Sequence, residues 1–286
     1  MFAWGQPPSA VQPSEARQSS VSAMLEVSAY LDRIRYTGPT EPTPETLRNL
    51  HRAHLFAVPF ENLDIVLGRR FVCDETAFIR KIVEHRRGGF CYELNGAFAA
   101  LLRELGFKVT LLSARVPRDD GSDGPEFDHL ALRVDLTEPW LADVGFGDSF
   151  LDPLRLEPGT EQLQGGRRFR IIEREHSLHM ERAEPPGSWK PQYSFTLTPR
   201  SLNDFASMCQ YHQTSPESPF TRKSVCTRAT PEGRITLADR KLILTHDGIR
   251  EEKLLESEEE RRAALRKYFG LTLEEPTDGW DLKAES

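Results

Sequence analysis

A pair of glycines followed at once by a helical pattern is the feature that most constrains the fold of this chain. The run Arg87-Gly88-Gly89-Phe90-Cys91 precedes apolar residues at spacings of three and four, which predict one buried face of a helix. These residues are Leu94, Ala97, Phe98, Leu101, Leu102 and Leu105. Because glycine adopts backbone conformations closed to other residues, the sequence predicts a sharp turn into a helix that begins at Cys91.

Cys91 falls at or just before the first turn of this helix. The free N–H groups and the positive end of the helix dipole favour a negative charge there. A thiol in such a place is expected to have a lowered pKa and to be a better nucleophile at neutral pH. The alternative is that Cys91 is a small buried apolar residue, since free cysteine is among the most buried residue types. The helix alone does not choose between the two.

Length, charge and cysteine usage exclude several classes of protein. The 286 residues can form two or three packed units, and a net charge of −7 gives no global basic field for nucleic acid. No apolar run approaches the roughly 20 residues that span a bilayer. The four cysteines lie far apart with no C-x-x-C pair, which argues against a zinc site or a disulfide scaffold and favours a reducing compartment. We therefore expect a cytoplasmic protein without a metal, a membrane partner or a nucleic-acid partner.

The first part of the chain is predicted to be helical after a leader rich in Ser, Pro, Gln and Ala. Residues 1–23 form this leader, which we expect to be disordered. Besides the Cys91 helix, helices are predicted over 25–34, from Thr43-Pro44 to Pro59, and from Asp74 onward. Residues 24–107 are therefore predicted to form a helical bundle.

From Lys108 the apolar pattern alternates with a period of two, which is typical of strands. Strand-like runs lie at 109–116, 129–136, 140–144, 169–172 and 193–197. Residues 108–200 are predicted to form a β-unit, either a small barrel or a sandwich. Residues 201–286 are predicted to be mixed α/β. Their short strands are expected at 235–237 and 241–245, and a helix at the capping box 257–260.

His129 and Asp143 are the best candidates to assist Cys91. A thiolate nucleophile needs a base within hydrogen-bond reach, and that base needs an orienting partner. His129 lies on a predicted strand whose alternate apolar residues face the core, and a hairpin near 136–139 would fold Asp143 back toward it. The sequence leaves the register open. The alternative for His129 is a strand histidine that a neighbour satisfies.

The other histidines give weaker signals. His51 and His54 are expected on the surface of their helix, and His176 and His179 form a metal-like pair without further ligands, so we expect them in solvent. Gly145-Phe146-Gly147 indicates a loop close to a flat group such as an aromatic ring, or else a simple turn. The glycine spacings match neither a dinucleotide fingerprint nor a phosphate-binding loop.

Taken in order, these motifs resemble the arylamine N-acetyltransferase family. The resemblance rests on Arg87 to Cys91, on His129-Leu130, on Asp143-Val144-Gly145-Phe146-Gly147, on Pro59-Phe60-Glu61-Asn62-Leu63 and on the run from Tyr211 to Phe220. It covers about Leu25 to Leu273. It implies an α+β, papain-like cysteine-protease-type fold, in which a helical bundle, a β-barrel and an α/β lid follow one another.

The resemblance also implies a chemistry. Acetyl-CoA would be the co-substrate and a small aromatic amine or hydrazine the acceptor, with the oxygen of N-hydroxyarylamines as a further acceptor. Cys91 would carry the acetyl group, His129 would act as base and acid, and Asp143 would orient His129 in a ping-pong cycle. The aromatic pocket maps onto Phe60 and Phe146. Coenzyme A contacts map onto Tyr211, Thr214, Ser215 and Ser218, for which an ordinary turn is the alternative.

Three rival functions and one departure from the family pattern remain. The rivals are an amide synthase that uses another acyl thioester, a cysteine peptidase-like or transglutaminase-like enzyme, and a non-catalytic binding module. Some members of the family carry arginine where this chain has Asp148. We hypothesise that an acid beside the pocket disfavours carboxylate-bearing amines by like-charge repulsion.

Overall fold

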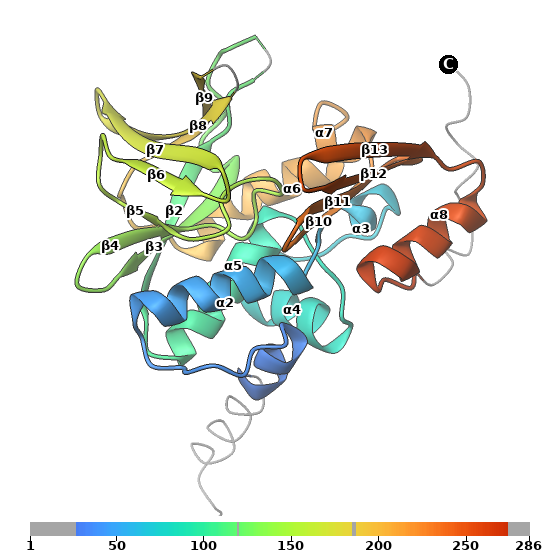
Figure 1. Ribbon diagram of the computed structural model, residues 1–286, viewed down its shortest axis with the longest axis horizontal. Coiled ribbons are helices and arrows are strands. Elements are labelled where there is room, and N and C mark those ends of the chain that lie inside the picture. Colours follow the sequence, from blue (N-terminus) through green and yellow to red (C-terminus); the bar gives the residue numbers. More distant parts are fainter. Residues whose placement is uncertain (1–26, 119, 185–186, 274–286) are drawn as a thin grey trace, which may run out of the picture.

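The computed structural model describes residues 27–118, 120–184 and 187–273 (Figure 1). The predicted leader over 1–23 lies outside the described residues. The described chain opens with a helical segment over 27–33, as predicted. Within these ranges no helix is both long and apolar enough to cross a membrane.

The first part of the chain is helical, as predicted. Its helices are α2 (Pro44–Ala57), the short α3 (Leu63–Val66), α4 (Glu75–Ile79), which continues as a π-helical turn over Arg80–Glu84, and α5 (Cys91–Glu104). The expected caps are present: Thr43 Oγ1 accepts the N–H of Thr46 at 3.1 Å, and Asp74 Oδ1 accepts the N–H of Ala77 at 2.9 Å. α5 is buried from its first residue to Leu102, because it lies between the other helices and the larger sheet (Figure 1).

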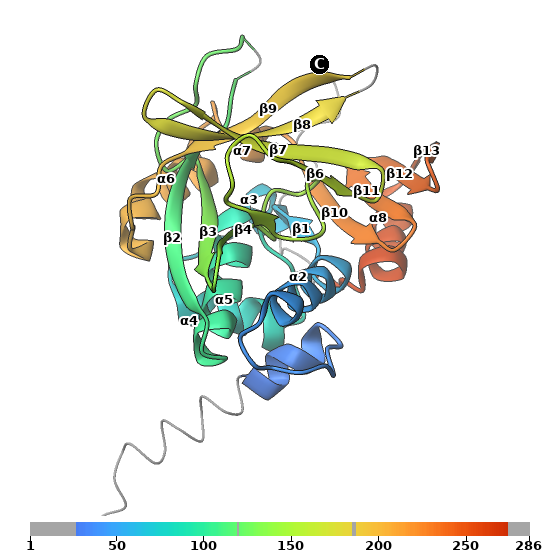
Figure 2. The same cartoon turned by 60° about the vertical axis from the view of Figure 1, so that its left-hand side comes forward.

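The middle of the chain forms an eight-stranded antiparallel sheet in the order β5-β4-β3-β2-β9-β8-β7-β6. Its strands are β2 (Lys108–Arg115), β3 (His129–Asp135), β4 (Pro139–Ala142), β5 (Leu154–Arg155), β6 (Glu161–Gln164), β7 (Arg167–Arg174), β8 (Ser177–Glu184) and β9 (Ser188–Phe195). Figure 2 shows the sheet curling, with β7, β8 and β9 arching over one end of β2 and β3.

Two glutamines join the edge strands of this sheet. Gln162 of β6 exchanges two side-chain hydrogen bonds with the backbone of Arg155 in β5, at 2.8 and 3.0 Å. Gln164 accepts the N–H groups of Leu151 and Asp152 at 3.1 and 2.8 Å. The sheet is therefore nearly closed, which confirms the barrel rather than the sandwich.

The remaining strands form a five-stranded antiparallel sheet in the order β1-β10-β11-β12-β13. They are β1 (Phe60–Glu61), β10 (Val225–Thr230), β11 (Gly233–Ala238), β12 (Lys241–His246) and β13 (Ile249–Leu254). α8 (Glu258–Ala264) and a π-helical turn over Leu265–Phe269 pack against this sheet. β1 comes from the first part of the chain, so this sheet ties the two ends of the fold together.

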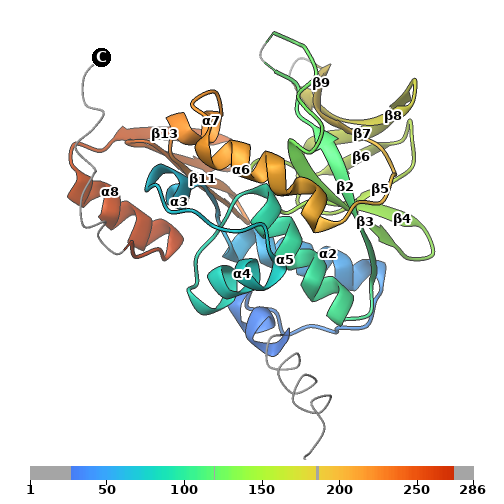
Figure 3. The same ribbon diagram turned by 180° about the vertical axis from the view of Figure 1, so that it is seen from behind.

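A last pair of helices connects the two sheets. A 3₁₀ turn over Leu202–Phe205 leads into α6 (Ala206–Thr214), which is followed by α7 (Pro219–Arg222). Seen from behind, α6 crosses α5 between the two sheets (Figure 3). The predicted division into 24–107, 108–200 and 201–286 stays a proposal for where packed units begin and end.

Candidate active site

The two glycines before Cys91 allow the turn to lie close to the backbone of Pro59 and Glu61. Neither has a positive φ, so the predicted need for a special backbone conformation is wrong. A Cβ on Gly88 would instead lie 2.0 Å from the carbonyl oxygen of Pro59. The carbonyl of Gly89 accepts the N–H of Glu61 at 2.8 Å. The turn before the nucleophile is therefore held against β1.

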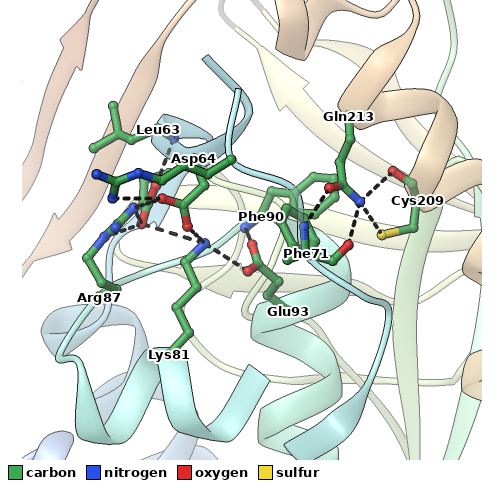
Figure 4. A network of polar contacts seen from close by, with 11 residues as sticks. Leu63, Asp64, Phe71, Lys81, Arg87, Phe90, Glu93, Cys209 and Gln213 are labelled. Carbon is green, nitrogen blue, oxygen red and sulfur yellow. Dashed lines mark hydrogen bonds and ion pairs between the residues drawn. The ribbon is translucent and has the colours of Figure 1, made fainter. Parts of the chain in front are cut away.

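A buried ionic network supports this turn (Figure 4). Glu93, at the third position of α5, accepts the backbone N–H of Phe90 at 3.0 Å and lies 2.8 Å from Lys81 Nζ. Lys81 also pairs with Asp64 at 2.8 Å, and Arg87 donates to Glu61 at 2.8 Å. Burial raises the pKa of Glu93 to about 7, although Lys81 opposes the shift. The network joins α3, α4 and α5 beneath the nucleophile.

Glu93→Ala is expected to lower the free energy of unfolding by about 3 kcal/mol, because it removes one partner of a buried charge and the cap of α5. The Glu93 side chain is 2% exposed. Glu84, which pairs with Arg80 but is 66% exposed, provides the control, since Glu84→Ala should change stability by less than about 0.5 kcal/mol. Urea unfolding of both variants checks the difference, and equal effects would contradict the assigned role of the network.

His129 and Asp143 lie together as predicted. His129 Nε2 is 2.8 Å from Asp143 Oδ2, and both side chains are buried. The register places Asp143 just after β4, whose Ala142 pairs with Leu132 of β3. The core-facing side of β3 is not confined to the alternate residues Leu130, Leu132 and Val134, because His129 and Ala131 on the other face are buried too and Ala131 packs in the barrel core.

Asp143 is held from several directions. Its Oδ1 accepts hydrogen bonds from Asn95 Nδ2 at 2.8 Å and from the N–H of Gly145 at 2.9 Å. Burial raises the pKa of Asp143, but the His129 charge and these hydrogen bonds outweigh it, so the pKa lies below its ordinary value. The ring of Tyr193 packs 5.2 Å from that of His129. The carboxylate is therefore kept ionised in a dry site.

Asn95 is a site residue that the sequence interpretation missed. It lies one helical turn after Cys91, and its amide also donates to the carbonyl of Leu130 at 2.6 Å and accepts the N–H of Val144 at 2.9 Å. A Cβ on Gly145 would lie 2.8 Å from the Cα of Cys91. The loop that carries Asp143 thus packs directly on the first turn of α5. A polar residue within the apolar helix pattern was the available signal.

The expectation that His51 and His54 lie on the surface is wrong. Both are fully buried. His51 Nδ1 donates to the carbonyl of Leu151 at 2.8 Å, and its Nε2 accepts the backbone N–H of Asp143 at 3.1 Å. Burial lowers the pKa of His51, which favours this neutral form. Both histidines share the helical stripe of Leu47 and Leu50, which is the buried side of α2.

The other histidine pair does not form a site. His176 is exposed, and His179 is partly buried with Nε2 3.0 Å from Ser177 Oγ. Across the described parts of the chain, no group of three or more His, Cys, Asp or Glu side chains is arranged to hold a metal ion.

Cys91 and His129 open into one cavity of about 580 Å³. The predicted pocket residues Phe60 and Phe146 line the same cavity. The other lining residues include Arg118, Asp128, Tyr211, His212, Phe220 and Arg222. The structure therefore brings the predicted nucleophile, base and aromatic pocket together.

Of the predicted coenzyme contacts, only Tyr211 lines this cavity. Thr214 Oγ1 donates to the carbonyl of Gln210 at 2.9 Å, and Ser215 Oγ accepts the N–H of Glu217 at 3.2 Å. Ser218 is fully buried, and its hydroxyl caps α7 by accepting the N–H of Phe220 at 3.2 Å. These three hydroxyls form hydrogen bonds within the protein, and their contacts with coenzyme A stay a prediction.

The expectation that the helix N-terminus lowers the pKa of Cys91 is wrong. Burial raises this pKa well above its ordinary value, and the carboxylate of Asp128 adds to the rise. Backbone groups of Leu130 and Tyr92 oppose it only in part. Exclusion of water thus outweighs the helix end.

Asp148 does not present an unpaired charge to the cavity. Its carboxylate lies 2.7 Å from Arg167, 3.1 Å from Arg234 and 3.7 Å from Arg182. Burial opposes ionisation, but Arg234 and the other arginines hold the pKa of Asp148 below its ordinary value. Asp148 is not among the residues that line the cavity. The hypothesis that it repels carboxylate-bearing amines therefore loses its premise.

Comparison with known proteins agrees with this geometry. An N-acetyltransferase family model matches residues 43–277. The arylamine N-acetyltransferase / N-hydroxyarylamine O-acetyltransferase of Salmonella typhimurium is 36% identical over 223 residues, which are 77% of this chain and 79% of that protein. The proansamycin X synthase of Amycolatopsis mediterranei is 29% identical over 255 residues, 86% of this chain and 97% of the synthase.

Solved structures have the same fold. That of the Mycobacterium marinum arylamine N-acetyltransferase in complex with CoA superposes with a TM-score of 0.80 at 34% identity, over 85% of this chain and 92% of that one. The match confirms the predicted papain-like arrangement of helices, barrel and lid. With its ordered motifs gathered at one cavity, this chain belongs to the arylamine N-acetyltransferase family.

Proposed function

We propose that this protein transfers the acetyl group of acetyl-CoA to the nitrogen of arylamines and arylhydrazines, and to the oxygen of N-hydroxyarylamines, through an acetyl-Cys91 intermediate. The observation that carries the proposal is the position of Cys91 and of the His129–Asp143 pair on one cavity with Phe60 and Phe146. The names of the relatives and the CoA complex of the M. marinum enzyme support the donor and the acceptor.

The residues divide the work of a ping-pong cycle. His129 takes the proton of the Cys91 thiol, and Asp143 stabilises the imidazolium that results. The sulfur attacks the thioester carbon of acetyl-CoA, and His129 returns the proton to the departing thiolate of coenzyme A. One thioester replaces another, so little free energy is lost. An amine then attacks acetyl-Cys91 and forms a stable amide, which drives the cycle forward.

Two arginines that line the cavity are suited to bind the phosphates of coenzyme A. Arg118 and Arg222 line it together with Tyr211. Guanidinium groups bind phosphate oxygens through paired N–H donors, so these arginines are the proposed partners of the coenzyme A phosphates. An amide synthase acting on another acyl thioester remains a second candidate, because a proansamycin X synthase is among the relatives.

Incubation with acetyl-CoA tests the proposal. We expect intact-mass spectrometry to find one acetyl group on the protein, peptide mapping to place it on Cys91, and aniline or hydralazine to remove it as the acetylated product. Cys91→Ala should abolish the adduct, whereas Cys226→Ala should keep it, since Cys226 is buried in the core of the five-stranded sheet. If the wild type forms no adduct with acetyl-CoA but is acylated by a longer acyl thioester, the result would favour the amide synthase.

A further inference from the structure

A second histidine–carboxylate pair lies in the catalytic cavity. Asp128 directly precedes His129, and its Oδ1 is 3.1 Å from Nε2 of His212 in α6. Both residues line the cavity with Cys91. The Asp128 side chain is 17% exposed and that of His212 is 4% exposed. The carboxylate is thus the more exposed of the two groups that line the cavity.

His212 is a rigid support for this carboxylate. Its Nδ1 is 3.2 Å from the hydroxyl of buried Ser218. Its ring packs against Phe220 and Tyr92, with centroids 5.1 and 6.1 Å away, and Tyr92 follows the nucleophile in sequence. α6, α7 and the first turn of α5 therefore fix the imidazole together.

Asp128 keeps its capacity to accept hydrogen bonds from a ligand. Nε2 of His212 is within ion-pair distance but is not aligned as a hydrogen-bond donor. Among the residues that the structure describes, no other N–H or O–H group donates to the Asp128 carboxylate. A Cβ on Gly124 would lie 3.0 Å from its Oδ2, so glycine leaves room on that side. His212 therefore orients the carboxylate of Asp128, whose oxygens can still accept hydrogen bonds from a ligand.

The negative charge of Asp128 opposes the acetylation of Cys91 but favours the transfer of the acetyl group to the amine. It raises the pKa of Cys91 and so opposes the thiolate that attacks acetyl-CoA. In acetyl-Cys91 the sulfur carries no charge, and this cost disappears. The incoming nitrogen then becomes positive as it attacks, and a nearby carboxylate stabilises that charge.

On the basis of the proposed function, we propose that Asp128 binds the N–H group of the acceptor amine and determines which amines are accepted. The nitrogen lone pair forms a bond to the acetyl carbon, and the C–S bond breaks with its electron pair returning to the Cys91 sulfur. One nitrogen proton passes to His129 and from there to the leaving Cys91 sulfur, so that no free thiolate forms beside Asp128, while the other N–H donates to the carboxylate of Asp128. Primary amines and hydrazines fit this arrangement. Amines with a carboxylate next to the reacting nitrogen are repelled.

Separate measurement of the two half-reactions tests the proposal. In Asp128→Asn, acetylation of Cys91 by acetyl-CoA should be as fast as in the wild type or faster. Removal of the acetyl group from the isolated acetyl-enzyme by aniline should be slowed about tenfold, because the neutral amide of asparagine can still accept the N–H but no longer stabilises the positive charge that develops on the nitrogen. Asp123→Asn removes a charge from an exposed position in the same loop and should change neither rate.

The wild type provides a second test that needs no variant. Its acetyl-enzyme should react at least tenfold faster with methyl 2-aminobenzoate than with 2-aminobenzoate, although the ester is the weaker nucleophile. A faster reaction with the carboxylate, or an equal slowing of both half-reactions in Asp128→Asn, would overturn the proposal. If the wild type acquires no acetyl group on Cys91, the proposed function fails first, and the role of Asp128 falls with it.

Discussion

Replacement of Asp143 by asparagine is expected to lower kcat/KM by about 10³- to 10⁴-fold while the protein stays folded. The carboxylate lies 2.8 Å from His129 Nε2, and in the proposed cycle it accepts from this nitrogen, which leaves Nδ1 to accept the proton of Cys91. An asparagine that keeps the Oδ1 bonds from Asn95 and Gly145 would turn its NH₂ group toward Nε2. The proton of His129 would then move to Nδ1, and the base would be blocked.

Steady-state kinetics with acetyl-CoA and aniline measure this loss. Asp135→Asn is the control, because Asp135 ends the strand that His129 begins and pairs with Arg133 away from the cavity. Its activity should stay within about twofold of the wild type, in line with the small effects of surface substitutions. An Asp143→Asn enzyme with more than a tenth of the normal activity would show that the carboxylate does not set the histidine tautomer.

Gly145→Ala is expected to have the second largest effect. The new methyl group would lie 2.8 Å from the Cα of Cys91 and 2.7 Å from Asn95 Nδ2. The Cys91 backbone cannot move without shifting α5, so the loop that carries Asp143 has to retreat. We expect the free energy of unfolding to fall by about 3 kcal/mol, as it does when a core is overpacked, and kcat to fall at least a hundredfold.

Thermal unfolding and single-turnover acetylation measure the two effects. Gly165→Ala is the matched control: its φ of 54° is left-handed, but no atom lies within 4 Å of the added methyl group. Gly165→Ala should lower the free energy of unfolding by only about 1 kcal/mol, which is the cost of a left-handed backbone conformation for alanine, and should leave kcat unchanged. Similar losses in both variants would mean that close packing on the nucleophile turn is not what requires glycine at Gly145.

The sequence predicted best the candidate site residues whose positions depend on short local patterns. Cys91 begins a helix, His129 begins a strand and Asp143 follows the next strand, and each position could be predicted from a short pattern. Their meeting depends on the register of one hairpin, which the sequence left open and the pairing of Leu132 with Ala142 settles.

The missed features depend on contacts between distant segments. The pKa of Cys91 is set by burial, which a helix pattern does not reveal. β8 was missed because its Glu181 is buried against Arg170 and Arg174, which breaks the expected alternation. β13 was missed because every residue of the strand is exposed. His51 could have been recognised, since it shares the buried stripe of α2.

One of the two glutamine side chains that close the barrel is linked by hydrogen bonds to Asp143. Gln164 holds the N–H of Leu151, the carbonyl of Leu151 receives the proton of His51, and His51 receives the N–H of Asp143. A chain of amide and imidazole groups thus runs from the outermost strand to the proposed catalytic carboxylate. A substitution at Gln164 is therefore expected to shift the backbone of Asp143 through His51 without changing a residue that lines the cavity.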